Sequence, residues 1–70
     1  MNVNLLKSQI VLKNKKISEI AEKLNISKSA LYRKLKCKTE FTRQEIEILI
    51  SYLDLNIEMA MAIFFNEKVS

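Results

Sequence analysis

The chain has 70 residues, which is enough for one small domain, so we expect residues 1–70 to form a single unit. It contains one cysteine, Cys37, and no histidine, which excludes a disulfide framework and leaves no basis for a metal site or a cofactor. No apolar run approaches the roughly 18 residues that a membrane span needs, and residues 1–7 lack the pattern of a secretory signal. We therefore expect a cytoplasmic protein without a membrane partner.

Charge is distributed unevenly along the chain. The formal net charge is +4, but residues 1–38 carry ten basic and two acidic side chains, whereas residues 39–70 carry two basic and six acidic ones. A basic half joined to an acidic half is typical of a protein that turns one face to a polyanion. A lysine-rich solvated surface would give the same counts, so charge alone leaves both interpretations open.

The chain has no glycine and no proline, so its helices must be separated by polar capping residues. Val3, Leu6 and Ile10 recur at helical spacing and predict a first helix over about residues 2–12. The polar residues 13–16 end it. These features indicate an all-α fold.

Two short helices follow. Apolar residues on one face predict a helix over 17–24, and Asn25 tolerates the left-handed conformation that ends a helix. Ser27 is a good N-cap for a third helix over about 28–36.

The second half of the chain predicts two more helices. Thr42 and Glu45 form a capping box that opens a fourth helix. Its apolar stripe comprises Ile46, Leu49, Ile50 and Leu53. Asn56 then caps a fifth helix over about 57–65, in which we expect Ala60, Met61, Ile63 and Phe64 to close the core.

Residues 17–36 meet the requirements of a helix-turn-helix. Ala21 is small where the third helix crosses the second, and Asn25 permits the turn. Ile26, Leu31 and Leu35 provide the apolar plug and anchors, and we expect Leu35 to dock against Ile10 of the first helix. The opposite face of the third helix carries Lys28, Ser29, Tyr32, Arg33 and Lys36.

The chain resembles the phage repressor/Cro family, the xenobiotic-response-element type of bacterial regulator. The resemblance rests on residues 20–21, 24–27 and 53–57 and on Leu31, and it extends over nearly the whole chain. It implies a compact five-helix, lambda-repressor-like domain that binds a short palindromic operator in double-stranded DNA as a homodimer. Stand-alone members often come from phages or other mobile elements.

Four positions depart from the family pattern. Asn25 stands in place of the turn glycine, and Cys37 in place of the glycine that often follows the third helix. Lys34 occupies a position that is usually apolar, with Leu35 beside it as the anchor. Ile17 replaces the polar residue that commonly touches phosphate at the start of the second helix.

The resemblance implies that the third helix lies in the major groove. The side chains that would read bases are Lys28, Ser29, Tyr32 and Arg33, with Arg33 as the candidate for a bidentate guanine contact. The side chains that would hold phosphates are Lys16, Lys36, Lys38 and Arg43.

The fifth helix is apolar on more than one face. If one stripe closes the core, then Ile57, Met59 and Phe65 remain exposed, and we expect them to form the homodimer interface. Two alternatives remain open. The chain could be a protein-binding module of the antitoxin or anti-repressor kind, or an architectural DNA binder such as an excision accessory protein. No nucleophile–base pair or phosphate loop suggests an enzyme, and no segment suggests a small-molecule ligand.

Overall fold

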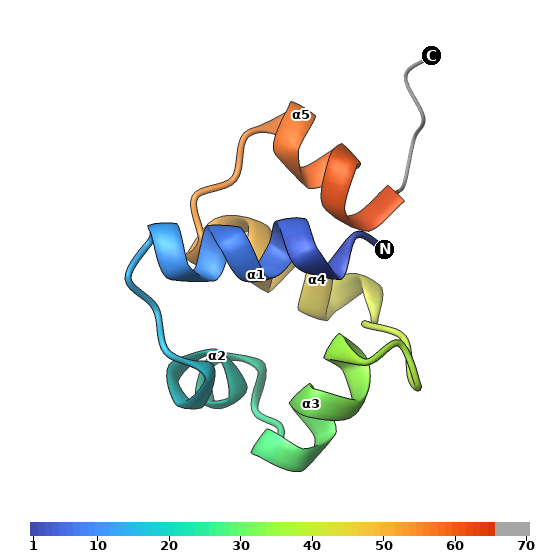
Figure 1. Ribbon diagram of the computed structural model, residues 1–70. Coiled ribbons are helices and arrows are strands. Elements are labelled where there is room, and N and C mark those ends of the chain that lie inside the picture. The colour runs from blue at the N-terminus through green and yellow to red at the C-terminus, as the bar shows by residue number, and fades with distance from the viewer. Residues whose placement is uncertain (66–70) are drawn as a thin grey trace.

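The computed structural model describes residues 1–65, which form an all-helical molecule (Figure 1). The elements in chain order are α1 (Val3–Leu12), α2 (Ile17–Leu24), α3 (Lys28–Leu35), α4 (Arg43–Tyr52), α5 (Ile57–Ala60) and the π-helical turn η1 (Met61–Phe65). In Figure 1, α1 and α4 lie in the middle of the molecule, with α5 above them and α2 and α3 below. The all-α expectation is confirmed, and the predicted helix over 57–65 divides into α5 and η1.

At the start of each α-helix, a side chain accepts a hydrogen bond from a backbone N–H that has no partner within the helix. The N-cap side chains that accept a backbone N–H three residues later are Asn2, Ser27, Thr42 and Asn56, at 2.8 to 3.1 Å. At α2 the arrangement is reversed, because the Glu19 carboxylate accepts the N–H of Lys16 at 2.8 Å. The predicted caps at Ser27 and Asn56 and the predicted capping box of Thr42 with Glu45 are confirmed.

The first four helices all end in the same left-handed turn. The residues with positive φ, between 51° and 61°, are Asn14, Asn25, Cys37 and Asp54. After α3, Cys37 N–H donates to the Lys34 carbonyl at 3.1 Å and Lys38 N–H donates to the Arg33 carbonyl at 2.9 Å, which is the Schellman pair of bonds. The same pair of bonds follows α1, α2 and α4. Although Cys37 carries a side chain, α3 therefore ends in the left-handed conformation that glycine adopts most readily.

The core draws on every helical segment. The largest fully buried side chains are Leu6, Ile20, Leu31, Leu49, Leu53 and Ile63. The α2 helix packs closely on both α3 and α4, and Ala21 is buried at 4% exposure. The large apolar side chains buried within residues 1–65 form one cluster, so we expect the helices to unfold together.

The backbone of the N-terminal helix packs mainly against η1. Ile10 and Leu35 are both buried in the shared core, as expected, while the backbone of α1 lies alongside η1 more extensively than alongside α3. Asn2 N–H also donates to the Ile63 carbonyl at 2.7 Å. The C-terminal segment returns across the start of the chain and takes this position beside α1 (Figure 1).

The expected burial of α5 needs one correction. Ala60 and Ile63 are buried and Phe64 is half-buried, but Met61 is 41% exposed, whereas Met59 is half-buried against the core. Helical spacing accounts for this burial, because Met59 lies four residues before the buried Ile63 and so on the same face, whereas Met61 lies two residues before it and on the opposite face. The buried stripe therefore includes Met59 and leaves Met61 outside.

Among the described residues, no helix is long and apolar enough to cross a membrane.

The left-handed conformation of Cys37 predicts that Cys37→Gly stabilises the protein by about 1 kcal/mol. A side chain at positive φ costs roughly 1–2 kcal/mol, which exceeds the extra freedom that glycine gives the unfolded chain. Lys36→Gly is the matched control, because Lys36 has φ −90° and gains nothing from glycine. Urea unfolding measures both variants, and an equal loss of stability in the two would contradict the prediction.

Candidate nucleic-acid interface

The arrangement of α2 and α3 depends on two residues, Ala21 within α2 and Asn25 at its end. Asn25 has φ 57° and ψ 43°, and its turn is closed by the bond from Ile26 N–H to the Ala21 carbonyl at 3.0 Å. Ala21 has no side chain beyond Cβ and is buried, and α2 packs against α3. The predicted roles of Ala21 as the small buried residue and of Asn25 as the left-handed turn residue are confirmed.

The α3 helix presents one buried face and one exposed face. Leu31 and Leu35 are 1% and 5% exposed and point into the core. The opposite face is exposed and consists of Lys28, Ser29, Tyr32, Arg33 and Lys36. These are the residues that the sequence placed together on this face. The ion pairs found within residues 1–65 involve none of them, so their polar groups are available to a ligand.

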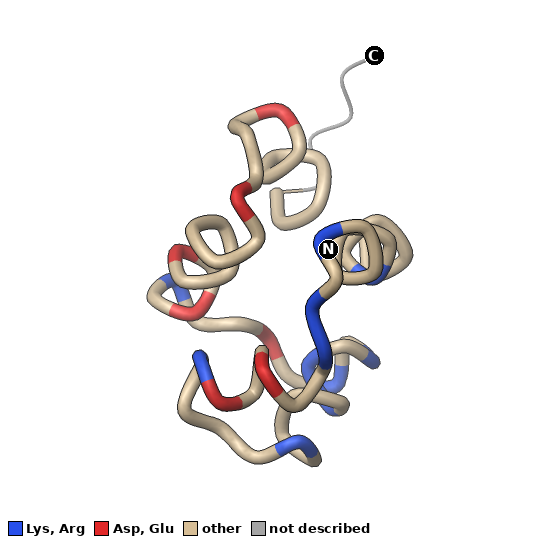
Figure 2. Tube along the Cα trace, turned by 90° about the vertical axis from the view of Figure 1, so that its left-hand side faces the viewer, with Lys and Arg blue, Asp and Glu red and all other residues tan. Residues whose placement is uncertain are grey.

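The remaining predicted phosphate-binding residues lie at the ends of the helices around α3. Lys16 immediately precedes α2, and Lys36 and Lys38 follow α3; all three are exposed. Arg43 opens α4 with a side chain that is 94% exposed, and its Nε lies 3.7 Å from Glu47 Oε2. Figure 2 shows basic segments predominating in the part built by α1 to α3, and acidic segments along α4 and α5.

Two lysines of the basic half place their ammonium groups over an aromatic ring at the end of α4. Lys15 Nζ lies 4.6 Å from the centre of the Tyr52 ring, and Lys23 Nζ lies 5.3 Å from it. These cation–π contacts connect the α1–α2 turn and α2 to the end of α4. Their charges are therefore partly committed to the fold, which the residue count could not indicate.

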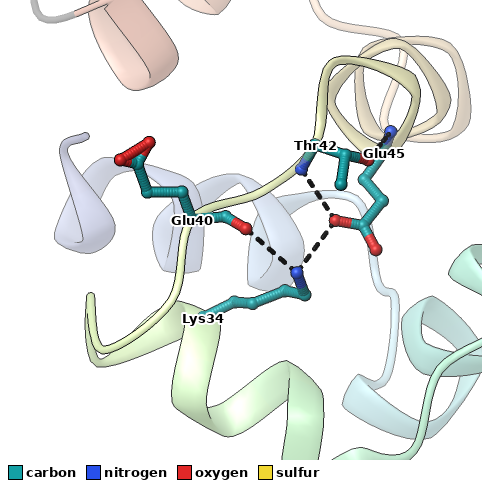
Figure 3. Close-up of polar contacts among 4 residues, drawn as sticks. All are labelled: Lys34, Glu40, Thr42 and Glu45. Atoms are coloured by element: carbon teal, nitrogen blue, oxygen red, sulfur yellow. Dashed lines mark hydrogen bonds and ion pairs between the residues drawn. The ribbon is translucent and has the colours of Figure 1, made fainter.

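Lys34 also points away from the exposed face of α3 (Figure 3). Its side chain is 13% exposed, and its ammonium lies 3.1 Å from Glu45 Oε1. The ammonium also donates to the Glu40 carbonyl at 3.0 Å and lies 5.7 Å from the centre of the Phe41 ring. The position of Lys34 between the buried residues Leu31 and Leu35 is a sequence signal for its partial burial. The sequence does not identify its partners Glu40 and Glu45, because they lie beyond the end of α3.

One oxygen of the Glu45 carboxylate makes two interactions. This atom, Oε1, accepts the N–H of Thr42 at 2.9 Å and also pairs with Lys34. Burial raises the pKa of Glu45, but the hydrogen bonds from Thr42 and Lys34, together with the Lys34 charge, outweigh burial and hold this pKa below its ordinary value of 4.5. The carboxylate is therefore ionised at neutral pH.

Comparisons with known proteins add nothing to this picture: no family model matches the chain, and neither the curated proteins nor the solved structures gave a match. Within residues 1–65, no group of three Asp, Glu, Cys or His side chains is placed to hold a metal ion. The interpretation of the site therefore depends on its geometry and charge.

The lowered pKa of Glu45 predicts a pH-dependent contribution to stability. Because the folded-state pKa is below the ordinary value, this contribution is present above pH 4.5 and is lost as the pH falls through the folded-state pKa. Glu45→Gln retains a side chain suited to the capping box but removes the charge. The difference in free energy of unfolding between wild type and Glu45→Gln should therefore be largest near neutral pH and shrink in acid.

Urea unfolding of both proteins at a series of pH values measures this difference. Glu58→Gln, at an exposed position in α5, controls for the change in net charge. A difference that stays constant down to about pH 3 would show that the ionised form of Glu45 contributes nothing to stability.

Proposed function

We propose that this protein binds double-stranded DNA by inserting α3 into the major groove, and that it acts as a transcriptional regulator of the phage repressor/Cro kind. The observation that carries the proposal is the exposed face of α3, where lysine, serine, tyrosine and arginine side chains lie opposite the buried Leu31 and Leu35. The left-handed turn at Asn25 leads from α2 into α3, which lies at one end of the molecule (Figure 1). A major groove about 12 Å wide accommodates a helix of this kind.

The exposed side chains of α3 differ in what they recognise. The Arg33 guanidinium has a planar fork that matches the two acceptors of guanine in the major groove. Tyr32 is 48% exposed and presents an aromatic surface to a sugar or a thymine methyl group. Lys28 and Ser29, in the first turn of α3, provide further donors to base edges.

The phosphate contacts in this proposal come from the exposed cations that surround α3. They are Lys16, Lys36, Lys38 and Arg43. The ion pair of Arg43 with Glu47 is solvent-exposed, so it costs little to exchange for a phosphate. Lys15, Lys23 and Lys34 are engaged with Tyr52 or Glu45 and contribute less.

An apolar stripe supports the proposal that the protein binds a palindromic operator as a homodimer. Ile57, Met61 and Phe65 are spaced four residues apart and are 78%, 41% and 55% exposed. Met61 takes the place that we expected for Met59, because Met59 is half-buried. The same stripe also supports a second candidate function, in which this face binds a different protein, as in an antitoxin or anti-repressor.

The first test separates base reading from phosphate binding. Selection from a random duplex pool yields a preferred site, and affinity is then measured on this site and on random duplex at several salt concentrations. Arg33→Ala should weaken binding to the preferred site by about 1–3 kcal/mol and weaken random duplex much less. Lys38→Ala should weaken both duplexes alike and reduce the salt slope by about one.

Lys23→Ala provides the matched control, because it removes the same charge from a side chain that faces Tyr52. Its effect on both duplexes should be small. An equal loss on both duplexes for Arg33→Ala would make Arg33 a phosphate contact. Absence of any preferred duplex, together with capture of a protein through the stripe on α5 and η1, would favour the second candidate function.

The second test concerns the homodimer. Sedimentation across a concentration series should show weak self-association of the free protein and firmer association on a palindromic site, with recognition helices about 34 Å apart. Phe65→Lys should weaken self-association both of the free protein and on the palindromic site, because it introduces a charge into the apolar stripe. Val11→Lys is the matched control, because Val11 is 74% exposed on α1, outside the stripe. A wild type that remains monomeric both free and on the site would refute the dimer.

A further inference from the structure

The contact between Lys34 and Glu45 joins α3, the proposed recognition helix, to the start of α4. The Lys34 ammonium has three donors, and two of its acceptors are fixed: Glu45 Oε1 at 3.1 Å and the Glu40 carbonyl at 3.0 Å. Figure 3 shows Lys34 reaching from α3 across to both of them. The two side chains of the ion pair are only 13% and 12% exposed, so water screens the pair weakly.

The same carboxylate oxygen also sets where α4 begins. Glu45 Oε1 accepts the Thr42 N–H at 2.9 Å, while Thr42 Oγ1 accepts the Glu45 N–H at 3.1 Å. A single carboxylate thus connects the N-terminus of α4 to the inner side of α3. A displacement of either helix would lengthen at least one of these bonds.

The segment between the two helices is therefore held at both ends. Its first residues are held by the turn bonds from Cys37 and Lys38 to α3, and its last residues are held by Lys34 and Glu45. This segment carries Lys38 and leads directly into Arg43, both of which are predicted phosphate contacts. The exposed face of α3 carries the predicted base contacts. The Lys34–Glu45 pair connects the helix that carries the one set to the segment that carries the other.

We infer that Lys34 and Glu45 are positioning residues, which fix the recognition helix and the α3–α4 segment in the relative orientation that lets both contact one duplex. The inference rests on the proposed DNA-binding function. An apolar residue at position 34 would fill the same space but would not fix the orientation of α3 relative to the start of α4. The charged pair does fix this orientation, because its interaction depends on where both partners lie. Because the Lys34 ammonium is turned toward α4, it determines where other side chains lie and neutralises no phosphate itself.

Lys34→Met and Glu45→Gln test this inference with little change in side-chain size. Glu45→Gln leaves the capping role in place, so it removes the charge pair alone. Each variant should bind the preferred site about tenfold more weakly, the size of one weakened base contact, and should bind random duplex within about twofold of wild type. The salt slope should stay unchanged for both, in contrast to Lys38→Ala.

Two further variants separate positioning from general stability. Lys34→Arg preserves the charge and the reach and should restore most of the preference for the selected site. The double variant Lys34→Met/Glu45→Gln should lose about as much as either single variant, because the pair acts as a unit. All binding is measured at a temperature at which circular dichroism shows each variant to be folded, and if Lys34→Met is unfolded there, then Glu45→Gln and Lys34→Arg decide the matter.

The outcomes distinguish this inference from the proposed function. A wild type with no preferred duplex overturns both. A selective wild type whose Lys34→Met and Glu45→Gln variants keep the full preference overturns the inference alone, and leaves Lys34 with a packing role. A salt slope reduced by about one in Lys34→Met also overturns it, because Lys34 would then contact phosphate directly.

Discussion

Reversing the chain without glycine is the constraint on which this fold depends. Asn14, Asn25, Cys37 and Asp54 each adopt the left-handed conformation at the end of a helix, and each does so with a side chain attached. Asparagine and aspartate tolerate this conformation better than other residues, so three of the four turns carry little strain. Because these turns are tight, the next helix begins soon after the end of α1, α2 and α4, and only α3 is followed by a longer segment. Helices of eight or ten residues can then return to a single small core.

Local features made much of this fold predictable. The caps at Ser27, Thr42 and Asn56 and the turn at Asn25 depend on residues within three or four positions of each other, so the sequence contains their full explanation. Burial on α5 and η1 was less predictable, because apolar side chains occupy more than one face of this segment. The face that turns inward is set by packing against distant parts of the chain such as α1, which no local pattern specifies.

In the candidate site, too, the features set by neighbouring residues were predictable and those set by distant residues were not. Helical periodicity was sufficient to place five polar side chains opposite Leu31 and Leu35. It could not assign the other cations, because their partners are far away in the sequence. Lys15 and Lys23 face Tyr52, and Lys34 faces Glu45. The charge of the N-terminal half therefore overstates the field that a nucleic acid would meet, and the specific arrangement around α3 matters more than the total.

The hydrogen bond from Asn2 N–H to the Ile63 carbonyl has a consequence for how the protein is made. It closes a loop over nearly the whole described chain, and Leu6 and Ile63 share the core that this closure completes. Because α1 precedes η1 by about fifty residues, the apolar face of α1 stays uncovered during synthesis until η1 has also left the ribosome. A fragment that lacks either α1 or η1 would therefore leave part of the shared core open to water.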